Sequence, residues 1–204
     1  MQDQEGIHVV RPRRAGRECV LPLRPGLPAI RTAMTLLKDF KGAIQSDGYE
    51  VYDKFDGLED KTMLGCWAHA RRKFVETMGE NRRLTSEAMV YIGDLYHVEA
   101  LAEESGMLPE SRMALWKEKA YPQIRKFKEW FETKYPNTTD GSLLRKAMGY
   151  TYKRLPKLAM NINDGNGLID NNGVENAIRP LALGRLCGVQ HNLPYVGNAI
   201  MLAS

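Results

Sequence analysis

The stretch TMLGCWAHARRKFV, residues 62–75, marks the point where the pattern of the chain changes from strand to helix. TMLGCW is a short apolar run of strand length, and helical spacing of the apolar side chains begins at Ala68. The sequence before it predicts a hairpin from GIHVVRPR and RECVLPLRP, a helix from AIRTAMTLLKDF, and a strand in GAIQSDGYEVY that ends at Asp47. Strands that alternate with a helix predict an α/β sheet.

The sequence after this stretch is helical in pattern for about ninety residues. We expect helices at 68–79, at 86–105, over 109–136 with an interruption at Pro122, and at 142–162. Their apolar stripes are typical of a bundle core rather than of a cofactor site. A Gly/Asn-rich loop, NDGNGLIDNNG, then leads to a further helix that carries Glu175.

Composition places the chain among ordinary globular proteins. Apolar residues make up 43% and charged residues 26%, and no apolar run is long enough to span a bilayer. The N-terminus lacks the pattern of a secretory signal, and three widely spaced cysteines favour a reducing compartment. We therefore expect a soluble, cytoplasmic protein with no membrane partner. The net charge of +4 is uneven, because residues 66–160 hold 17 Lys and Arg against 12 Asp and Glu. This surplus fits a polyanion, but solvated helix faces would give it equally.

Glu175 has two interpretations from its position. It follows Asn172 by three residues at the start of a helix, which is the spacing of an N-cap and its reciprocal N3 glutamate. A metal-binding glutamate can be presented in the same way. Asp47, at the carboxyl end of a predicted strand, is a second candidate ligand, although a lone strand-end Asp is more often a turn residue. Spacing alone does not pair these two carboxylates.

Three blocks carry a resemblance to a known family: IQSDGYEVYDKF, MLGCWAHARRKFVE and IDNNGVENAIRPLALGR. In this order, with a helical segment between the second and third, they resemble the bacterial insertion-sequence 66 family of transposases over nearly the whole chain. The resemblance implies a DDE-type enzyme with an RNase H-like α/β core, a mixed sheet with flanking helices, interrupted by a large all-helical insertion. Such enzymes use two Asp and one Glu to bind Mg²⁺ or Mn²⁺, cut transposon ends by hydrolysis, and join the freed 3′ hydroxyl to target DNA.

The resemblance assigns roles to individual residues. Asp47 in SDGY matches the second catalytic, metal-binding aspartate, and Glu175 in NNGVEN matches the catalytic, metal-binding glutamate. Cys66 and His69 in CWAH match a Cys-x-x-His signature at the junction of the last core strand and a helix. Four arginines follow these motifs and are candidates for binding DNA phosphates, with surface salt bridges as the alternative: Arg71, Arg72, Arg179 and Arg185.

The resemblance also predicts the organisation of the chain. Residues 1–67 would form the first part of the core, 68–162 the helical insertion, and 163–204 the core-completing helix and C-terminal segment. No residue matches the first catalytic Asp, whose strand would precede GIHVVRPR, and the sequence after LALGR departs from the family pattern. We therefore expect a truncated, catalytically incomplete transposase chain that holds its metal weakly. Its partners would be transposon-end and target DNA, with itself or a full-length transposase as a further partner, on the bacterial nucleoid when DNA-bound.

Two other functions remain open at this stage. The chain could be a non-catalytic remnant that binds DNA or a transposase through its basic helical segment. It could also be a zinc module, since Cys66, His69, Cys187 and His191 offer four suitable ligands. The two half-sites are more than a hundred residues apart, however, and Cys66 and His69 also suit packing and hydrogen bonding at the strand–helix junction.

Overall fold

The computed structural model of the chain describes residues 6–9, 17–22, 34–35, 37–46, 48, 50–163, 165, 167–170, 172 and 200–203. The chain divides into two compact units. The first comprises Met1–Met63 with Asp170–Ser204, and the second comprises Leu64–Ile169. Each unit is described by itself below.

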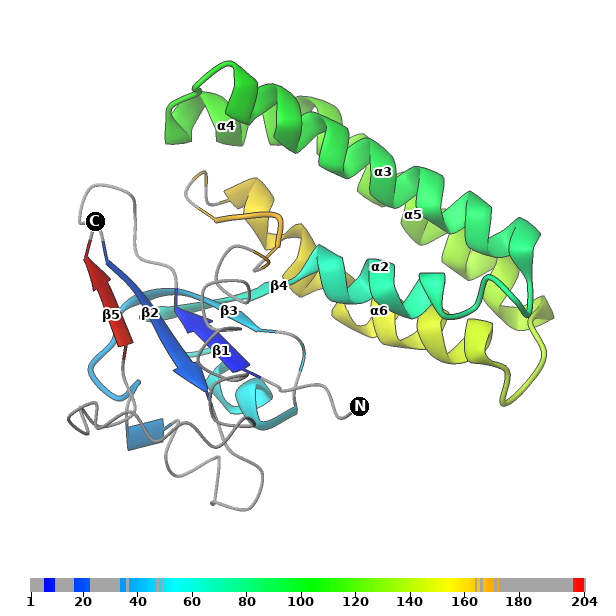
Figure 1. The fold of residues 1–204 in the computed structure, drawn as a ribbon, viewed down its shortest axis with the longest axis horizontal. Coiled ribbons are helices and arrows are strands. Elements are labelled where there is room, and N and C mark those ends of the chain that lie inside the picture. The colour runs from blue at the N-terminus through cyan, green and yellow to red at the C-terminus, as the bar shows by residue number, and fades with distance from the viewer. Residues whose placement is uncertain are drawn as a thin grey trace, which may run out of the picture. The chain divides into compact units, whose positions relative to one another are not determined.

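A mixed sheet organises the first unit (Figure 1). Its strand order is β4-β3-β1-β2-β5, with bounds β1 Gly6–Val9, β2 Arg17–Pro22, β3 Gly42–Ser46, β4 Lys61–Gly65 and β5 Ile200–Ala203. The predicted hairpin is confirmed, because β1 and β2 pair antiparallel with Ile7 opposite Leu21. β1 also pairs antiparallel with β3, and β2 pairs antiparallel with β5.

β3 and β4 form a small parallel pair at one edge of this sheet. The amide of Gly42 donates to the carbonyl of Asp60 at 2.9 Å, and the connection between the strands contains the short helix η2, Glu50–Phe55. Ile44, Tyr52 and Phe55 are fully or almost fully buried. The prediction of a strand that ends just before Asp47 is therefore confirmed for β3.

Three elements of the first unit need comment. The strand predicted over 62–67 is wrong at its end, because β4 stops at Gly65 and a helix begins at Trp67. β5 was not predicted, since a run of four apolar residues carries no signal that distinguishes a strand from a loop until its partner β2 is known. Of the helix predicted over residues 29–40, only residues 34 and 35 are described as helical.

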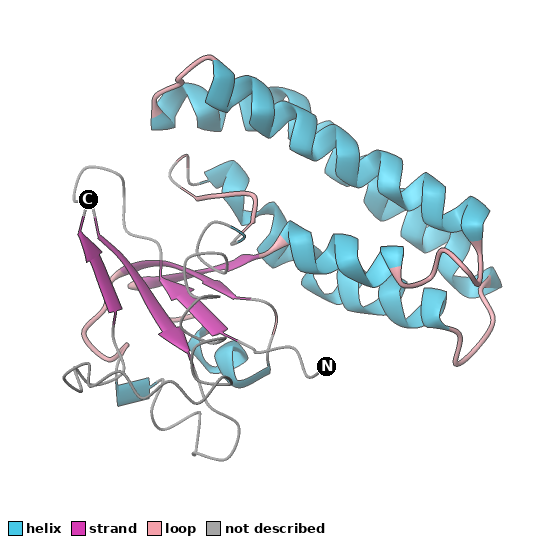
Figure 2. Ribbon diagram, viewed as in Figure 1, coloured by secondary structure: helices cyan, strands magenta, loops and turns pink. Residues whose placement is uncertain are grey.

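The second unit is a helical bundle (Figure 2). Its elements are α2 Trp67–Val75, α3 Arg82–Glu104, α4 Pro109–Leu115, η3 Trp116–Ala120, α5 Tyr121–Lys134, η4 Tyr135–Asn137, α6 Leu143–Ala159 and η5 Met160–Asn163. These elements confirm the four helical segments that the periodicity predicts, with shifted ends. The core gathers aromatic side chains, among them Phe74, Phe127 and Phe131, around which α2, α3, α5 and α6 pack.

The interruption predicted at Pro122 is a π-helical segment rather than a break. Pro122 has no amide hydrogen, and its ring would crowd the carbonyl four residues earlier in a regular helix. The amide of Tyr121 instead donates to the carbonyl of Trp116, five residues back, and the wider turn of η3 lets α4 continue into α5. Among the described residues, no helix is long and apolar enough to cross a membrane.

Candidate functional site

The GCWAH motif, residues 65–69, is the best defined of the three sequence blocks. Gly65 ends β4 and Cys66 occupies the N-cap position of α2 in an extended conformation. A Cβ at Gly65 would lie 2.9 Å from Cδ2 and 3.0 Å from the backbone nitrogen of Leu158 on α6. Only glycine lets the start of α2 approach α6 so closely.

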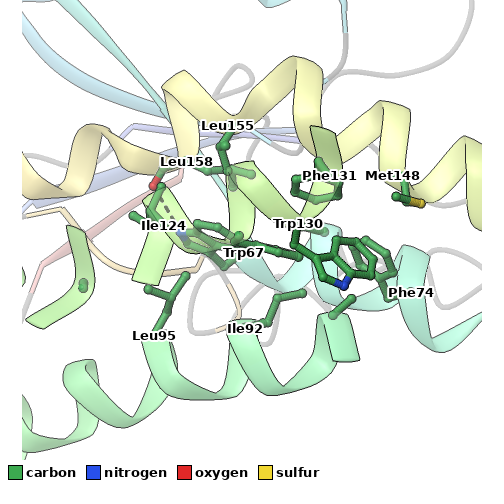
Figure 3. Close-up of a cluster of buried hydrophobic side chains, with 14 of the residues drawn as sticks. Trp67, Phe74, Ile92, Leu95, Ile124, Trp130, Phe131, Met148, Leu155 and Leu158 are labelled. Carbon is green, nitrogen blue, oxygen red and sulfur yellow. Dashed lines mark hydrogen bonds between the residues drawn. The ribbon is translucent and has the colours of Figure 1, made fainter. Parts of the chain in front are cut away.

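Trp67 ties this motif to two distant parts of the second unit, of which Figure 3 shows the contact with Leu158. Its side chain is fully buried, and the indole Nε1 donates to the carbonyl oxygen of Leu158 at 3.1 Å. Its backbone amide donates to the carbonyl oxygen of Ile169 at 3.1 Å. Ile169 is the first residue of the third block, IDNNGVENAIRPLALGR, so this hydrogen bond holds the start of that block to the second block.

Cys66 and His69 fall on the junction that the sequence predicts for them. The Cys66 side chain is buried and makes no cap hydrogen bond to α2, and His69 is half-buried one turn into that helix. The other half of the zinc hypothesis, Cys187 and His191, lies outside the described residues. Within the described ranges, no group of three or more His, Cys, Asp or Glu side chains could hold a metal ion.

Asp47 itself lies outside the described residues, but both of its neighbours are described. Ser46, the last residue of β3, is buried, and its Oγ accepts a hydrogen bond from the amide of Gly48 at 3.3 Å. Gly48 has a φ of 94°, a backbone conformation that favours glycine and turns the chain after the strand. Asp47 therefore follows a rigid, buried strand end, a position that suits a residue whose carboxylate must be aimed.

Glu175 also lies outside the described residues. Just before it, the carboxylate of Asp170 accepts hydrogen bonds from the backbone amide of Asn172 at 3.0 Å and from its Nδ2 at 2.8 Å. A side-chain oxygen that accepts from the amide two residues later forms a local Asx turn. The capping role and the ligand role of Glu175 both stay predictions.

The four candidate arginines divide into two pairs. Arg71 is exposed and Arg72 half-buried on α2, while Arg179 and Arg185 lie outside the described residues. No hydrogen bond or ion pair involves Arg71 within the described part of the chain.

Comparison with known proteins gives the family. The described residues are mostly helical, with one small sheet that contains a parallel pair of strands. Residues 29–192 match the model of the transposase IS66 family, and the chain belongs to this family. The resemblance read from the three blocks is thus confirmed. No solved structure matches the chain.

Three proteins of Sinorhizobium fredii (strain NBRC 101917 / NGR234) are similar to the chain, and each is named only as uncharacterized. Protein y4qI is 30% identical over 157 residues, which cover 73% of this chain and 29% of the relative. Protein y4hP is 29% identical over 166 residues, which cover 73% of this chain and 30% of the relative. Protein y4jD is 29% identical over 177 residues, which cover 82% of this chain and 33% of the relative. The chain spans about a third of the length of the curated relatives it matches.

Proposed function

We propose that the chain acts in DNA transposition as part of a DDE-type transposase, with Asp47 and Glu175 as metal-binding carboxylates. Membership of the IS66 transposase family over residues 29–192 is the observation that carries this proposal. The buried end of β3 directly before Asp47 supports it, since a carboxylate on a rigid strand end can be aimed at a metal ion.

The proposed fold of the first unit is an RNase H-like core, interrupted by a helical insertion over residues 68–162. Support comes from the mixed sheet, with its antiparallel hairpin and parallel β3–β4 pair, and from the helical unit Leu64–Ile169 that separates the two chain segments of the first unit.

The chemistry of the donor set fits a hard divalent cation. Asp and Glu offer charged oxygen ligands of the kind that Mg²⁺ and Mn²⁺ prefer. When bound, such ions polarise phosphoryl oxygens and lower the pKa of water or a hydroxyl group. The residues of this chain would supply the ligands, and phosphate-binding arginines such as Arg71, Arg72, Arg179 and Arg185 would position the DNA backbone.

Metal binding tests the two carboxylates directly. Mn²⁺ titration of the full chain, followed by the loss of the electron paramagnetic resonance signal of free Mn²⁺, is expected to show binding. Loss of even an outer-shell partner typically costs about 10- to 100-fold in metal affinity. Asp47→Asn and Glu175→Gln should therefore each weaken binding at least about tenfold. The matched control is Glu59→Gln, which removes an exposed carboxylate from the same unit. Equal affinities for Asp47→Asn and Glu59→Gln would refute the site.

The alternative function is a DNA-binding or transposase-binding role without catalysis. The basic surplus of the helical segment favours it. Two results together would support this alternative and contradict the metal site: the wild-type chain binds no Mn²⁺, and Asp47→Asn binds duplex DNA with the same affinity as the wild type.

A further inference from the structure

Charge is segregated among the helices of the second unit. α6 carries five basic residues and no acidic residue: Arg145, Lys146, Lys153, Arg154 and Lys157. α2 carries Arg71, Arg72 and Lys73, also with no acidic residue. α3, by contrast, has two basic residues against five acidic ones. α5 holds four basic residues against two acidic ones, so α6 is the helix with the largest basic excess in the unit.

The lysines of α6 form a stripe on its outer face. Lys146, Lys153 and Lys157 are separated by seven and four residues, with Tyr150 between the first two, so all four share one face of the helix. The opposite face is the buried one and carries Leu144, Ala147, Met148, Thr151, Leu155 and Leu158. Lys146 and Lys153 are exposed, and Lys157 is half-buried. The stripe runs about 16 Å along the helix axis.

Ion pairs one helical turn apart, which neutralise cations on other helices of the unit, are not open to Lys146 and Lys153. Arg83 on α3 pairs with Glu87 at 2.8 Å, and Lys128 on α5 pairs with Glu132 at 3.8 Å, both one turn apart. α6 has no acidic residue with which to form such pairs. Within the described part of the chain, Lys146 and Lys153 take part in no ion pair or hydrogen bond.

Arg145 serves the fold rather than this surface. Its Nη1 donates to the carbonyl oxygens of Tyr135 at 2.8 Å and Thr138 at 2.7 Å, and its Nε pairs with Asp140 at 2.9 Å. Its guanidinium is thereby committed to the loop before α6. The guanidinium of Arg154 lies 4.3 Å from the centre of the Tyr150 ring, which places another cation beside the lysine stripe.

We propose that the outer face of α6, with Lys146, Lys153 and Lys157 as its central residues, binds the phosphate backbone of duplex DNA. The identity of the polyanion rests on the proposed function. A duplex presents a phosphate every 3.4 Å along each strand, so a stripe of about 16 Å faces several phosphates at once. Lysine ammonium groups on flexible stems suit contacts of this kind, which position DNA without reading its sequence.

The test measures affinity and its salt dependence on the full chain. A short fluorescein-labelled duplex of arbitrary sequence is titrated, and binding is followed by fluorescence anisotropy between about 50 and 200 mM salt. The test variant is Lys146→Gln with Lys153→Gln. The matched control is Lys117→Gln with Lys126→Gln, which removes the same charge from exposed positions in η3 and α5.

The double change on α6 is expected to reduce the slope of log affinity against log salt by about 1.8, since each phosphate contact contributes about 0.9. The affinity should fall about tenfold or more at the lower salt, while the control changes the slope by less than about half that amount. Glutamine keeps the helix propensity, so circular dichroism should give unchanged helix content and thermal midpoint for both variants.

Three results would overturn the proposal. The first is an unchanged DNA affinity in the α6 variant. The second is an equal loss of DNA affinity in the α6 variant and the control variant, which would indicate an effect of total charge. The third is a wild-type dimer, detected by sedimentation, that the α6 variant dissociates without losing DNA affinity; the face would then bind a second copy. Mn²⁺ binding is measured in a separate experiment. If the wild-type chain binds Mn²⁺ as proposed, any of these three results would contradict the DNA-binding face but not the proposed function.

Discussion

The backbone amide of Trp67 donates a hydrogen bond to the carbonyl oxygen of Ile169 across a distance of 3.1 Å. This bond joins the start of α2 to the segment that enters the NNGVEN motif, although the two residues are far apart in sequence. The next residue after Ile169, Asp170, accepts the hydrogen bonds from Asn172. The described residues that precede Glu175 are therefore held to α2 at Ile169 and form a local turn between Asp170 and Asn172.

The first prediction concerns the indole of Trp67. Trp67→Phe keeps an aromatic ring but leaves the buried carbonyl of Leu158 without its donor. An unsatisfied buried acceptor and a small cavity should together lower the free energy of unfolding by about 2–4 kcal/mol in urea denaturation. Trp130→Phe is the matched control: its Nε1 donates to Glu87, whose half-exposed carboxylate can turn to water. We expect a smaller loss there, and equal losses would contradict the role given to the Leu158 carbonyl.

Gly65 provides a second test of the same junction. Gly65→Ala places a Cβ against Leu158 at 2.9 Å from its side chain and 3.0 Å from its backbone nitrogen, and the backbone contact cannot be relieved by a rotamer change. We expect a loss of about 1–3 kcal/mol in the free energy of unfolding. Gly93→Ala in α3, where nothing lies within 4 Å of the added Cβ, should instead stabilise by about 0.5–1 kcal/mol. A Gly65→Ala protein as stable as wild type would show that the close approach is not needed.

The sequence predicted the elements whose signals are local. The hairpin, the strand before Asp47 and the helical segments after Ala68 follow from spacing within each element, and all are present. The family was identified from three short sequence blocks, and the match of residues 29–192 to the family model confirms it. β5 was missed because its pairing with β2 is non-local, and the hydrogen bonds from Asn172 to Asp170 were missed because spacing alone does not show which side chain accepts in an Asn- and Asp-rich loop. The roles of Asp47 and Glu175 remain predictions.

Long-range side-chain partners were beyond the reach of the sequence. Glu99 on α3 and Arg112 on α4 form a buried ion pair, and the Trp116 indole donates to the same carboxylate at 2.8 Å. Spacing suggests Trp116 as a core residue but not its partner. In the sequence these residues are ordinary charged side chains on two helices. Whether they pair depends on how the helices pack, which the spacing does not show.

The third prediction concerns this buried ion pair. Arg112→Met leaves the Glu99 carboxylate buried without its cation and should cost about 3–5 kcal/mol in the free energy of unfolding. The double variant Arg112→Met with Glu99→Gln removes both charges and keeps an acceptor for Trp116, so it should recover much of that loss. Additive losses in urea denaturation would contradict the coupling of the two charges.

The last prediction concerns Glu80, whose carboxylate caps a helix 63 residues away in sequence. Its Oε2 accepts from the amide of Leu143 at 2.9 Å and its Oε1 from that of Leu144 at 3.2 Å, at the first turn of α6. These amides have no partner within the helix. The negative charge of the carboxylate also interacts favourably with the positive, N-terminal end of the helix dipole. Glu80→Ala should therefore lower the free energy of unfolding by about 0.5–2 kcal/mol.

The matched control for Glu80 is Glu76→Ala, which removes an exposed carboxylate whose nearest cation, on Lys73, is 3.9 Å away. A surface change of this kind should stay within about 0.5 kcal/mol. Hydrogen exchange adds a local readout, because loss of the cap should raise the exchange rates of the Leu143 and Leu144 amides in Glu80→Ala but not in Glu76→Ala. If both variants lost the same stability and exchanged alike, the carboxylate of Glu80 would not be the cap that holds the start of α6. Because α6 carries the lysine stripe, the same comparison also tells whether this cap orders the proposed DNA-binding face.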